Sequence, residues 1–291
     1  GIEADGIGTQ EMNQTSDAKH CVRCGAPYDY AVYYYAHLGR YACPSCGHKR
    51  PKPEVYVDRI WDADAKGTSF HLVTPAGSFE SRLQIPGLYN LYNALAAAAG
   101  AHLMGCSLES IKQGLSETTS QFGRMELIPM DGREVFMALV KNPVGFNSVL
   151  ETVMGPGGNL RGPCEFSPGG GCRPEGSGKK VVIAINDLYA DGTDVSWLWD
   201  VDFESMAAQQ ERIDWVICAG IRAEDMAVRL KYAGFDTAKL TTLGDLEGAL
   251  AQGMQRTPQG EMLYILPTYT AMLGMREIIQ KQGHTKKFWE V

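Results

Sequence analysis

Short apolar runs separated by amphipathic segments dominate the second half of the chain and predict alternating strands and helices. Strands are expected over residues 135–140, 181–185, 215–219, 239–243 and 262–266. Helices are expected over residues 147–154, 223–233, 245–254 and 270–280. Apolar strands that alternate with helices indicate a largely parallel sheet covered on both faces. The Gly/Pro-rich stretch 155–180 breaks this pattern and predicts a surface loop.

The first half of the chain has a different pattern. Residues 1–16 are polar and irregular, and strand-like segments follow at residues 54–61, 69–73 and 79–85. An alanine-rich helix is expected over residues 89–104, and Ser107 is a suitable N-cap for a second helix over residues 107–115. The segment Phe122-Gly123-Arg124 predicts a hinge. We therefore expect two domains, residues 1–122 and 123–291.

Two Cys-x-x-Cys pairs, each followed by glycine, are the strongest chemical signal in the sequence. Cys21 and Cys24 form the first pair, Cys43 and Cys46 form the second pair, and 18 residues lie between the two pairs. Four thiolates make a closed tetrahedral zinc site, which is structural because it leaves no open coordination position. We therefore predict a zinc ribbon over about residues 18–52. The alternative is a pair of redox dithiols or buried thiols.

The other four cysteines are scattered and do not form the dense set of a disulfide scaffold, so a reducing cytoplasm is expected. Cys106 and Cys218 lie in apolar contexts and are predicted to be inert core residues. Cys164 and Cys172 lie in the Gly/Pro-rich loop and are expected to be bystander thiols. The histidines near the zinc ribbon are expected at the surface rather than on the metal: His20, His37 and His48.

The composition of the chain argues against bulk nucleic-acid binding and against a membrane-spanning helix. The 291 residues carry a formal net charge of -7, which is unfavourable for bulk binding to a phosphate backbone. No apolar run approaches the roughly 18 residues that a membrane-spanning helix needs. The chain begins Gly1-Ile2-Glu3, which is typical of a domain interior, so we expect a piece of a longer protein.

Two segments resemble the Mur ligases, a family of ATP-dependent amide-forming enzymes. Residues 85–98 (IPGLYNLYNALAAA) are similar to the family's Gly-x-x-Asn-x-x-Asn-x-x-Ala-Ala helix start. Residues 122–126 (FGRME) are similar to the Gly-Arg-Met/Leu-Glu segment that links two domains in the family. The resemblance implies that Asn90, Asn93 and Arg124 line a nucleotide site. A helix N-terminus with free amides and a planar guanidinium both suit phosphate groups.

A third segment indicates a branch of that family. Residues 140–147 (VKNPVGFN) stand where most Mur ligases have an Asp-Tyr-Ala-His-Asn-Pro type segment, so the aspartate and histidine are missing. This replacement, the zinc ribbon and the segments 191–204 and 266–272 together resemble the MurT family. The implied fold is the C-terminal part of a Mur-ligase central domain with an inserted zinc ribbon, followed by a Rossmann-like α/β domain.

The resemblance also implies an activity. MurT proteins pair with GatD, a glutamine amidotransferase that releases ammonia, in a cytoplasmic bacterial complex at the inner face of the membrane. With ATP and magnesium, they convert the D-glutamate α-carboxylate of lipid II into D-isoglutamine through an acyl-phosphate. The sequence has no Gly-x-x-x-x-Gly-Lys-Ser/Thr phosphate loop. We therefore expect that loop and the magnesium ligands in a preceding part, and we expect these residues alone to be inactive.

An acidic cluster follows the strand expected at residues 181–185, where parallel sheets commonly place function. Its members are Asp191, Asp194, Asp200, Asp202 and Glu204. The resemblance implies that one aspartate completes the Cys-His pair of the GatD glutaminase, and an acid beside histidine fixes its tautomer. Asp200 is the first candidate, followed by Asp202 and Asp194. The alternative is an acidic surface loop anchored by a buried tryptophan.

Two other functions stay open. An amino-acid-adding Mur or folylpolyglutamate-type ligase would share the nucleotide motifs, but the zinc ribbon and the replaced Asp/His segment argue against it. A non-catalytic zinc-ribbon binding module, for example for nucleic acid, is a different class. The acidic pI of about 5.4 and the lack of a basic stripe argue against this module.

Overall fold

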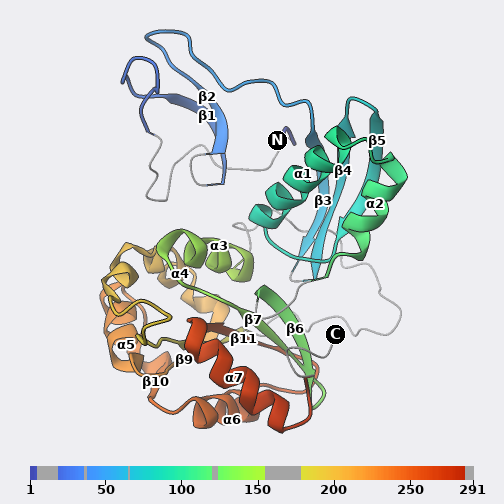
Figure 1. The fold of residues 1–291 in the computed structure, drawn as a ribbon. Coiled ribbons are helices and arrows are strands. Elements are labelled where there is room, and N and C mark those ends of the chain that lie inside the picture. Colours follow the sequence, from blue (N-terminus) through green and yellow to red (C-terminus); the bar gives the residue numbers. More distant parts are fainter. Residues whose placement is uncertain (5–18, 36–37, 65, 120–123, 155–177, 286–291) are drawn as a thin grey trace. The chain divides into compact units, whose positions relative to one another are not determined.

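A computed structural model describes residues 1–4, 19–35, 38–64, 66–119, 124–154 and 178–285 (Figure 1). The chain forms two compact units, Gly1–Thr119 and Ser120–Val291. Each unit has its own core, and each is described by itself. No helix among the described residues is both long enough and apolar enough to cross a membrane.

The first unit is built on a three-stranded antiparallel sheet in the order β3 (Tyr56–Asp64), β4 (Gly67–Thr74), β5 (Gly77–Leu83). Two helices pack on it, α1 (Leu88–Leu103) and α2 (Leu108–Glu117). The predicted strands and helices of this half are thus confirmed. Ser107 caps α2 as expected, because its hydroxyl accepts a hydrogen bond from the amide of Ser110 at 3.1 Å.

The start of the chain belongs to this core, contrary to the expectation of an irregular polar segment. Ile2 is fully buried and forms a parallel bridge with Val57 of β3. Its side chain joins apolar residues of the sheet and both helices, including Phe70, Leu91 and Ile111. One isoleucine in a polar stretch gives no periodic signal, so the pattern could not reveal this contact.

The cysteine-rich segment forms a separate two-stranded hairpin of β1 (Asp29–Tyr35) and β2 (Leu38–Ala42). Val32 and Tyr34 of β1 pack against the core of the first unit. The Cys-x-x-Cys turns precede β1 and follow β2, so the hairpin brings both cysteine pairs to the same end.

The second unit is a six-stranded sheet in the order β10-β9-β8-β11-β7-β6. Its strands are β6 (Arg124–Met130), β7 (Arg133–Ala138), β8 (Lys179–Ala184), β9 (Ile213–Ala219), β10 (Leu240–Leu243) and β11 (Met262–Pro267). All neighbours are parallel except β6, which is antiparallel to β7. The predicted parallel sheet is therefore confirmed, with one antiparallel edge strand added.

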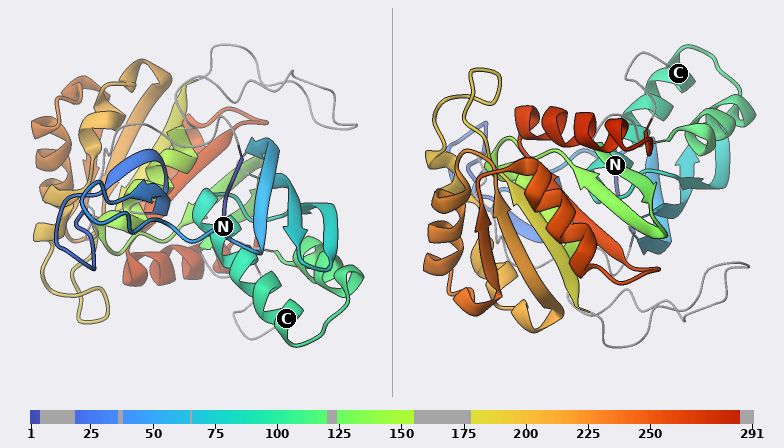
Figure 2. Two further views of the ribbon diagram at one scale, coloured as in Figure 1. Left: turned by 90° about the horizontal axis from the view of Figure 1, so that it is seen from above. Right: turned by 90° about the horizontal axis from the view of Figure 1, so that it is seen from below.

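Helices cover both faces of this sheet (Figure 2). One layer consists of α6 (Leu246–Arg256) and α7 (Tyr269–Lys281), whose buried faces join the strand core around Val182 and Ile265. The other layer holds α3 (Pro143–Met154), α4 (Phe203–Ala207) and α5 (Ala223–Tyr232), together with the short 3-10 helix η1 (Ser196–Asp200). In this layer Phe146 of α3 packs edge-on against Phe203 of α4, with ring centroids 5.0 Å apart.

Three expectations need correction. Strand β6 begins at Arg124, where a hinge was predicted, while residues 120–123 lie outside the described part of the chain. The predicted loop 155–180 ends earlier, because Lys179 and Lys180 already belong to β8. Cys106 is exposed in the turn after α1, whereas Cys218 is buried as expected. Cys164 and Cys172 lie outside the described residues.

Candidate functional site

The four cysteines of the hairpin lie together. Their sulfur atoms are all within 4.8 Å of one another, with Cys21–Cys46 at 3.6 Å and Cys24–Cys43 at 3.4 Å. A tetrahedral site with zinc–sulfur bonds of about 2.3 Å places its sulfurs roughly 3.8 Å apart. The observed separations fit that geometry, and among the described residues no disulfide and no fifth ligand competes with it.

The two Cys-x-x-Cys turns have the same backbone conformation. The amide of Gly25 donates to the carbonyl of Cys21 at 2.8 Å, and the amide of Gly47 donates to that of Cys43 at 3.0 Å. Both glycines have a positive φ, 75° and 72°, which a residue with a side chain adopts at a cost. The glycine after each pair is therefore required by the turn that aims both sulfurs at one point.

The thiols do not ionise equally by themselves. Burial opposes ionisation of Cys21, but amide hydrogen bonds from Arg23 and Cys24 outweigh it and lower its pKa to about 6. An amide hydrogen bond from Ala26 favours the thiolate of Cys24, but proton sharing with Cys43 and Cys46 raises its pKa to about 12. Four thiolates so close together need a cation to offset their repulsion, which is the role a bound divalent metal would have.

The nearby histidines are not placed as metal ligands. His48 Nδ1 is 2.8 Å from the hydroxyl of Tyr28, and that hydroxyl accepts a hydrogen bond from the amide of Val22. His48 therefore supports the first cysteine turn from outside the sulfur cluster. His20 lies exposed beside the same turn, and His37 is outside the described residues.

The structure brings Asn90 and Asn93 together at the first turns of α1. The side-chain amide of Asn93 donates to Asn90 Oδ1 at 3.4 Å, and that of Asn90 donates to the carbonyl of Pro86 at 2.7 Å. Gly87, the N-cap, has φ 94° and provides no side-chain cap. The amides of the first turn are thus left without a side-chain cap, as an anion site at a helix N-terminus requires.

Arg124 is the first residue of β6 and the first described residue of the second unit. Its side chain is not among the described ones, so its contact with nucleotide stays a prediction. The next residue, Met125, has φ 57° and forms a bulge between the pairs Arg124–Ala138 and Glu126–Met137. Glu126 is ion-paired with Arg276 of α7. The bulge therefore lies directly after the candidate arginine in the sequence.

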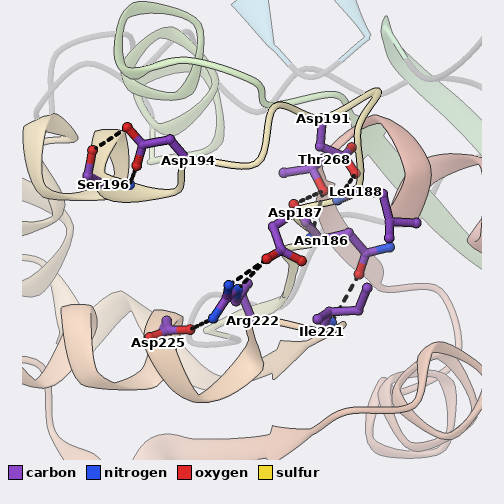
Figure 3. Close-up of polar contacts among 10 residues, drawn as sticks. All are labelled: Asn186, Asp187, Leu188, Asp191, Asp194, Ser196, Ile221, Arg222, Asp225 and Thr268. Carbon is purple, nitrogen blue, oxygen red and sulfur yellow. Dashed lines mark hydrogen bonds and ion pairs between the residues drawn. The ribbon is translucent and has the colours of Figure 1, made fainter.

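A polar cluster that the sequence did not predict lies at the carboxyl ends of β8, β9 and β11 (Figure 3). Asn186 Oδ1 accepts from the amide of Ile221 at 3.0 Å, and the amide of Asn186 donates to the hydroxyl of Thr268 at 2.9 Å. Asp187 is mostly buried and accepts two contacts from Arg222, at 2.5 and 2.7 Å. The sequence contains one signal for this ion pair, because Asp187 and Arg222 each follow one of two adjacent parallel strands.

Most carboxylates of the acidic cluster accept hydrogen bonds that hold the fold together. Asp191 accepts from the amide of Thr270 at 2.7 Å and from the amide of Leu188 at 3.2 Å. Asp194 accepts from the amide and hydroxyl of Ser196, and the amide bond is the main cause that lowers its pKa. Asp202 caps α4 by accepting from the amide of Ser205 at 3.0 Å.

Glu204 is paired with a buried arginine. Its two carboxylate oxygens accept from Arg229 at 2.9 and 2.8 Å, and these hydrogen bonds lower the pKa of Glu204. The same guanidinium donates to the carbonyls of Leu198 and Val201. Arg229, which lies on α5, therefore holds η1 and the start of α4 in place through hydrogen bonds. The carboxylate of Glu204 accepts the remaining hydrogen bonds of this guanidinium.

Asp200 differs from its neighbours. It is exposed at the last position of η1, and no hydrogen bond or ion pair is found for its carboxylate within the described part of the chain. Trp199 beside it is 55% exposed, and its ring lies 5.8 Å from that of Tyr232, which is 73% exposed. The guanidinium carbon of Arg229 lies 5.4 Å from the centroid of the Trp199 ring and packs against the face of that ring. The segment thus presents a free carboxylate beside two exposed aromatic rings.

The fold resembles that of the Mur ligases. The chain is similar to a pseudomurein peptide ligase type C from Methanothermus fervidus, with a TM-score of 0.63 and 22% identity over 97% of this chain and 51% of that one. It is also similar to the folylpolyglutamate synthase of Mycobacterium tuberculosis, solved with ADP and AMPPCP, with a TM-score of 0.52 and 18% identity over 81% of this chain and 49% of that one. The fold is therefore a Mur-ligase-like α/β fold.

Sequence relatives narrow this class. Residues 170–272 match the profile of the family described as MurT ligase C-terminal. The chain is 33% identical, over 92% of its length and 54% of the relative, to the MurT subunit of a glutamine-hydrolysing lipid II isoglutaminyl synthase from Streptococcus pneumoniae. The corresponding Staphylococcus aureus subunit is 30% identical over 93% of this chain and 55% of its own length. The chain is a homologue of these MurT subunits over more than nine-tenths of its own length, and it spans about half of theirs.

Proposed function

We propose that the protein containing this chain amidates the D-glutamate α-carboxylate in the stem peptide of lipid II. ATP phosphorylates that carboxylate to an acyl-phosphate and leaves as ADP. Ammonia then attacks the acyl carbon, phosphate leaves, and D-isoglutamine remains. Its similarity to lipid II isoglutaminyl synthase subunits over more than nine-tenths of the chain supports this reaction.

The two units have different parts in this proposal. The first is the C-terminal part of a Mur-ligase-type central domain with a zinc ribbon, and Cys21, Cys24, Cys43 and Cys46 hold one structural zinc ion. Sulfur separations of 3.4 and 3.6 Å support that assignment. The second unit is a Rossmann-like domain, as its strand order and two helical layers suggest.

The nucleotide site is formed by Asn90, Asn93 and Arg124 with residues outside this chain. The start of α1 supports it, because a helix N-terminus without a side-chain cap offers the positive end of its dipole to phosphate. Magnesium would bridge the phosphates and neutralise charge that develops during transfer. The protein would work in the bacterial cytoplasm, at the inner face of the membrane that holds lipid II.

Ammonia would come from a GatD-type glutaminase bound to the second unit. Free ammonia is scarce at neutral pH, so a synthetase that consumes it benefits from an attached supplier. The observation that carries this part is the unengaged, exposed carboxylate of Asp200 beside Trp199 and Tyr232. Tryptophan and tyrosine are enriched at the centre of protein interfaces. Asp200 would orient the catalytic histidine of the partner, with Asp202 and Asp194 as weaker candidates.

The experiment that tests the reaction uses the full-length protein with its glutaminase partner, ATP, magnesium and lipid II. Mass spectrometry of the released stem peptide distinguishes the amide from the carboxylic acid. We expect amidation with glutamine, and also with a high concentration of ammonium when the partner is left out. Addition of an amino acid to the stem peptide, with no response to ammonium, would identify an amino-acid-adding ligase instead.

A further inference from the structure

The cysteine-rich hairpin is positively charged, whereas the chain as a whole is negative. Residues 19–52 contain six lysine and arginine residues and one aspartate, a formal charge of +5, while the whole chain carries -7. When four thiolates hold one zinc dication, the formal charge of residues 19–52 falls by two, to +3. Positive charge is therefore concentrated in this small module of an acidic protein.

Most of these cations face solvent, and no partner is found for them in the part of the chain that the structure describes. Arg50 is ion-paired with Glu3, and Arg40 has an interaction inside the chain. The other four are exposed, and no ion pair or hydrogen bond is found for their side chains among the described residues: Lys19, Arg23, Lys49 and Lys52. Structural needs therefore do not account for them. Four exposed cations on one short module generate a positive local potential that attracts an anionic surface.

Tyrosine side chains cover the face of the hairpin that is turned away from the protein core. Tyr30 and Tyr41 lie directly opposite each other on the two strands, and Tyr33 stacks on Tyr30 with ring centroids 4.1 Å apart. Tyr28 packs against Tyr41 at 4.6 Å. All four are half-buried, while Tyr34 supplies the contact with the core. A tyrosine has an apolar ring and a polar tip, which suits the boundary between lipid and water.

The metal-binding end of the hairpin also carries an exposed apolar residue. Val22, inside the first Cys-x-x-Cys turn, is 82% exposed, and it lies directly beside the cation of Arg23. The equivalent positions of the second turn, Pro44 and Ser45, are exposed as well. A rigid, metal-fixed turn with an apolar side chain beside a cation can enter the headgroup layer of a bilayer at low entropic cost.

We propose that the four-cysteine hairpin docks the protein on an anionic membrane surface. Cations supply long-range attraction to acidic headgroups, and Val22 with the tyrosine face supplies short-range burial, so the hairpin combines the two kinds of signal that stable membrane association takes. The reason for the protein to visit a membrane rests on the proposed function, since lipid II is anchored there. Docking would hold the synthetase close to a substrate that cannot leave the bilayer.

The test uses the full-length, zinc-loaded protein and sedimentation with vesicles. Vesicles of equal parts phosphatidylglycerol and phosphatidylcholine should bind it, and vesicles of phosphatidylcholine alone should not. Arg23→Gln with Lys49→Gln should weaken binding roughly 30-fold, on the order of fivefold for each cation removed near the surface. Tyr30→Ser with Tyr33→Ser should weaken it too. Lys112→Gln with Lys231→Gln removes the same charge elsewhere and should leave binding unchanged. Zinc content confirms that each variant keeps its fold.

The outcomes separate the possibilities. Equal binding to both kinds of vesicle, or equal loss in the control variant, overturns the assignment to the hairpin. Preference for a single-stranded oligonucleotide over phosphatidylglycerol vesicles, lost in the same hairpin variant, makes the module a nucleic-acid binder and overturns docking on membranes. Vesicle binding is measured without turnover, so its failure is distinct from failure of the proposed reaction. If both proposals hold, the hairpin variant amidates detergent-solubilised lipid II normally and vesicle-embedded lipid II slowly.

Discussion

Asp191 caps α7, because its carboxylate accepts hydrogen bonds from both the amide and the hydroxyl of Thr270, which is 79 residues away in the sequence. The N-cap residue of α7, Thr268, provides no side-chain cap of its own. An anion at a helix N-terminus also interacts favourably with the helix dipole. The contact ties the loop after β8 to the end of β11, and so it fixes the start of the segment that leads to Asp200.

We predict that Asp191→Ala lowers the free energy of unfolding by about 1–2 kcal/mol, the usual cost of losing a helix cap. Because the loop loses its anchor, glutaminase activity in the complex should fall as well. Denaturant unfolding and glutamine hydrolysis measure the two effects. Asp194→Ala is the matched control for stability, since the hydrogen bonds found for Asp194 among the described residues all come from nearby Ser196. Equal stability of the two variants would show that the long-range cap is unimportant.

The zinc ribbon predicts a stoichiometric metal. Protein purified without chelators should contain one zinc per chain by elemental analysis, and Cys43→Ser should abolish it. Structural zinc sites couple metal binding to folding, so the variant should lose structure in the hairpin and stability in the first unit. Cys106→Ser is the control, because Cys106 is exposed and lies outside the cluster. A zinc-free wild-type protein would contradict the prediction.

The sequence predicted the interior strands of the second unit because each is a short, nearly continuous apolar run. It missed β6 for a physical reason: this strand lies at the sheet edge, is antiparallel, and contains Pro129, which only an edge tolerates well. The cysteine cluster followed from spacing alone. The Asp187–Arg222 ion pair could not be predicted from spacing, because its members are 35 residues apart and meet through the adjacency of β8 and β9.

The nucleotide motif predicts a selective defect. In the full-length complex, Arg124→Ala should lower kcat/KM for ATP about 10- to 100-fold, the range expected for one charge-assisted contact to phosphate. Glutamine hydrolysis should change little. Arg212→Ala is a suitable control, because Arg212 is exposed and donates to the side chain of Gln209. Equal loss of both activities in Arg124→Ala would indicate misfolding and remove the support for a nucleotide role.

The Glu204–Arg229 pair predicts a pH dependence of stability. Hydrogen bonds from Arg229 lower the pKa of folded Glu204 below its ordinary 4.5, so its stabilisation is present above pH 4.5 and is lost as pH falls through the folded pKa. Glu204 is more than half exposed, so Glu204→Gln should cost no more than about 1 kcal/mol near pH 7. The difference from wild type should shrink as the pH falls below 4.5 and through the folded pKa of Glu204. Glu211→Gln is the matched control for stability near pH 7, because no ion pair is found for Glu211 among the described residues. Urea unfolding at several pH values checks this.

The last prediction concerns the three aspartates that compete for a role in glutamine hydrolysis. Asp194 and Asp202 bond to the serines that follow them, and asparagine caps a helix about as well as aspartate does. Asp194→Asn and Asp202→Asn should therefore keep both fold and glutaminase activity. Asp200→Asn removes the one carboxylate of the three for which no partner is found among the described residues.

Asp200→Asn should reduce glutamine hydrolysis in the complex by about 10⁴-fold, as loss of the acid does in a catalytic triad. The complex should still assemble, because Trp199 and Tyr232 are untouched, and ammonium should still drive amidation. Gel filtration with the partner and ammonium-driven turnover are the controls that separate a catalytic defect from a binding defect. If activity is lost instead in Asp202→Asn, the carboxylate that caps α4 must leave Ser205 to reach the partner, and the complex would have to rebuild that turn.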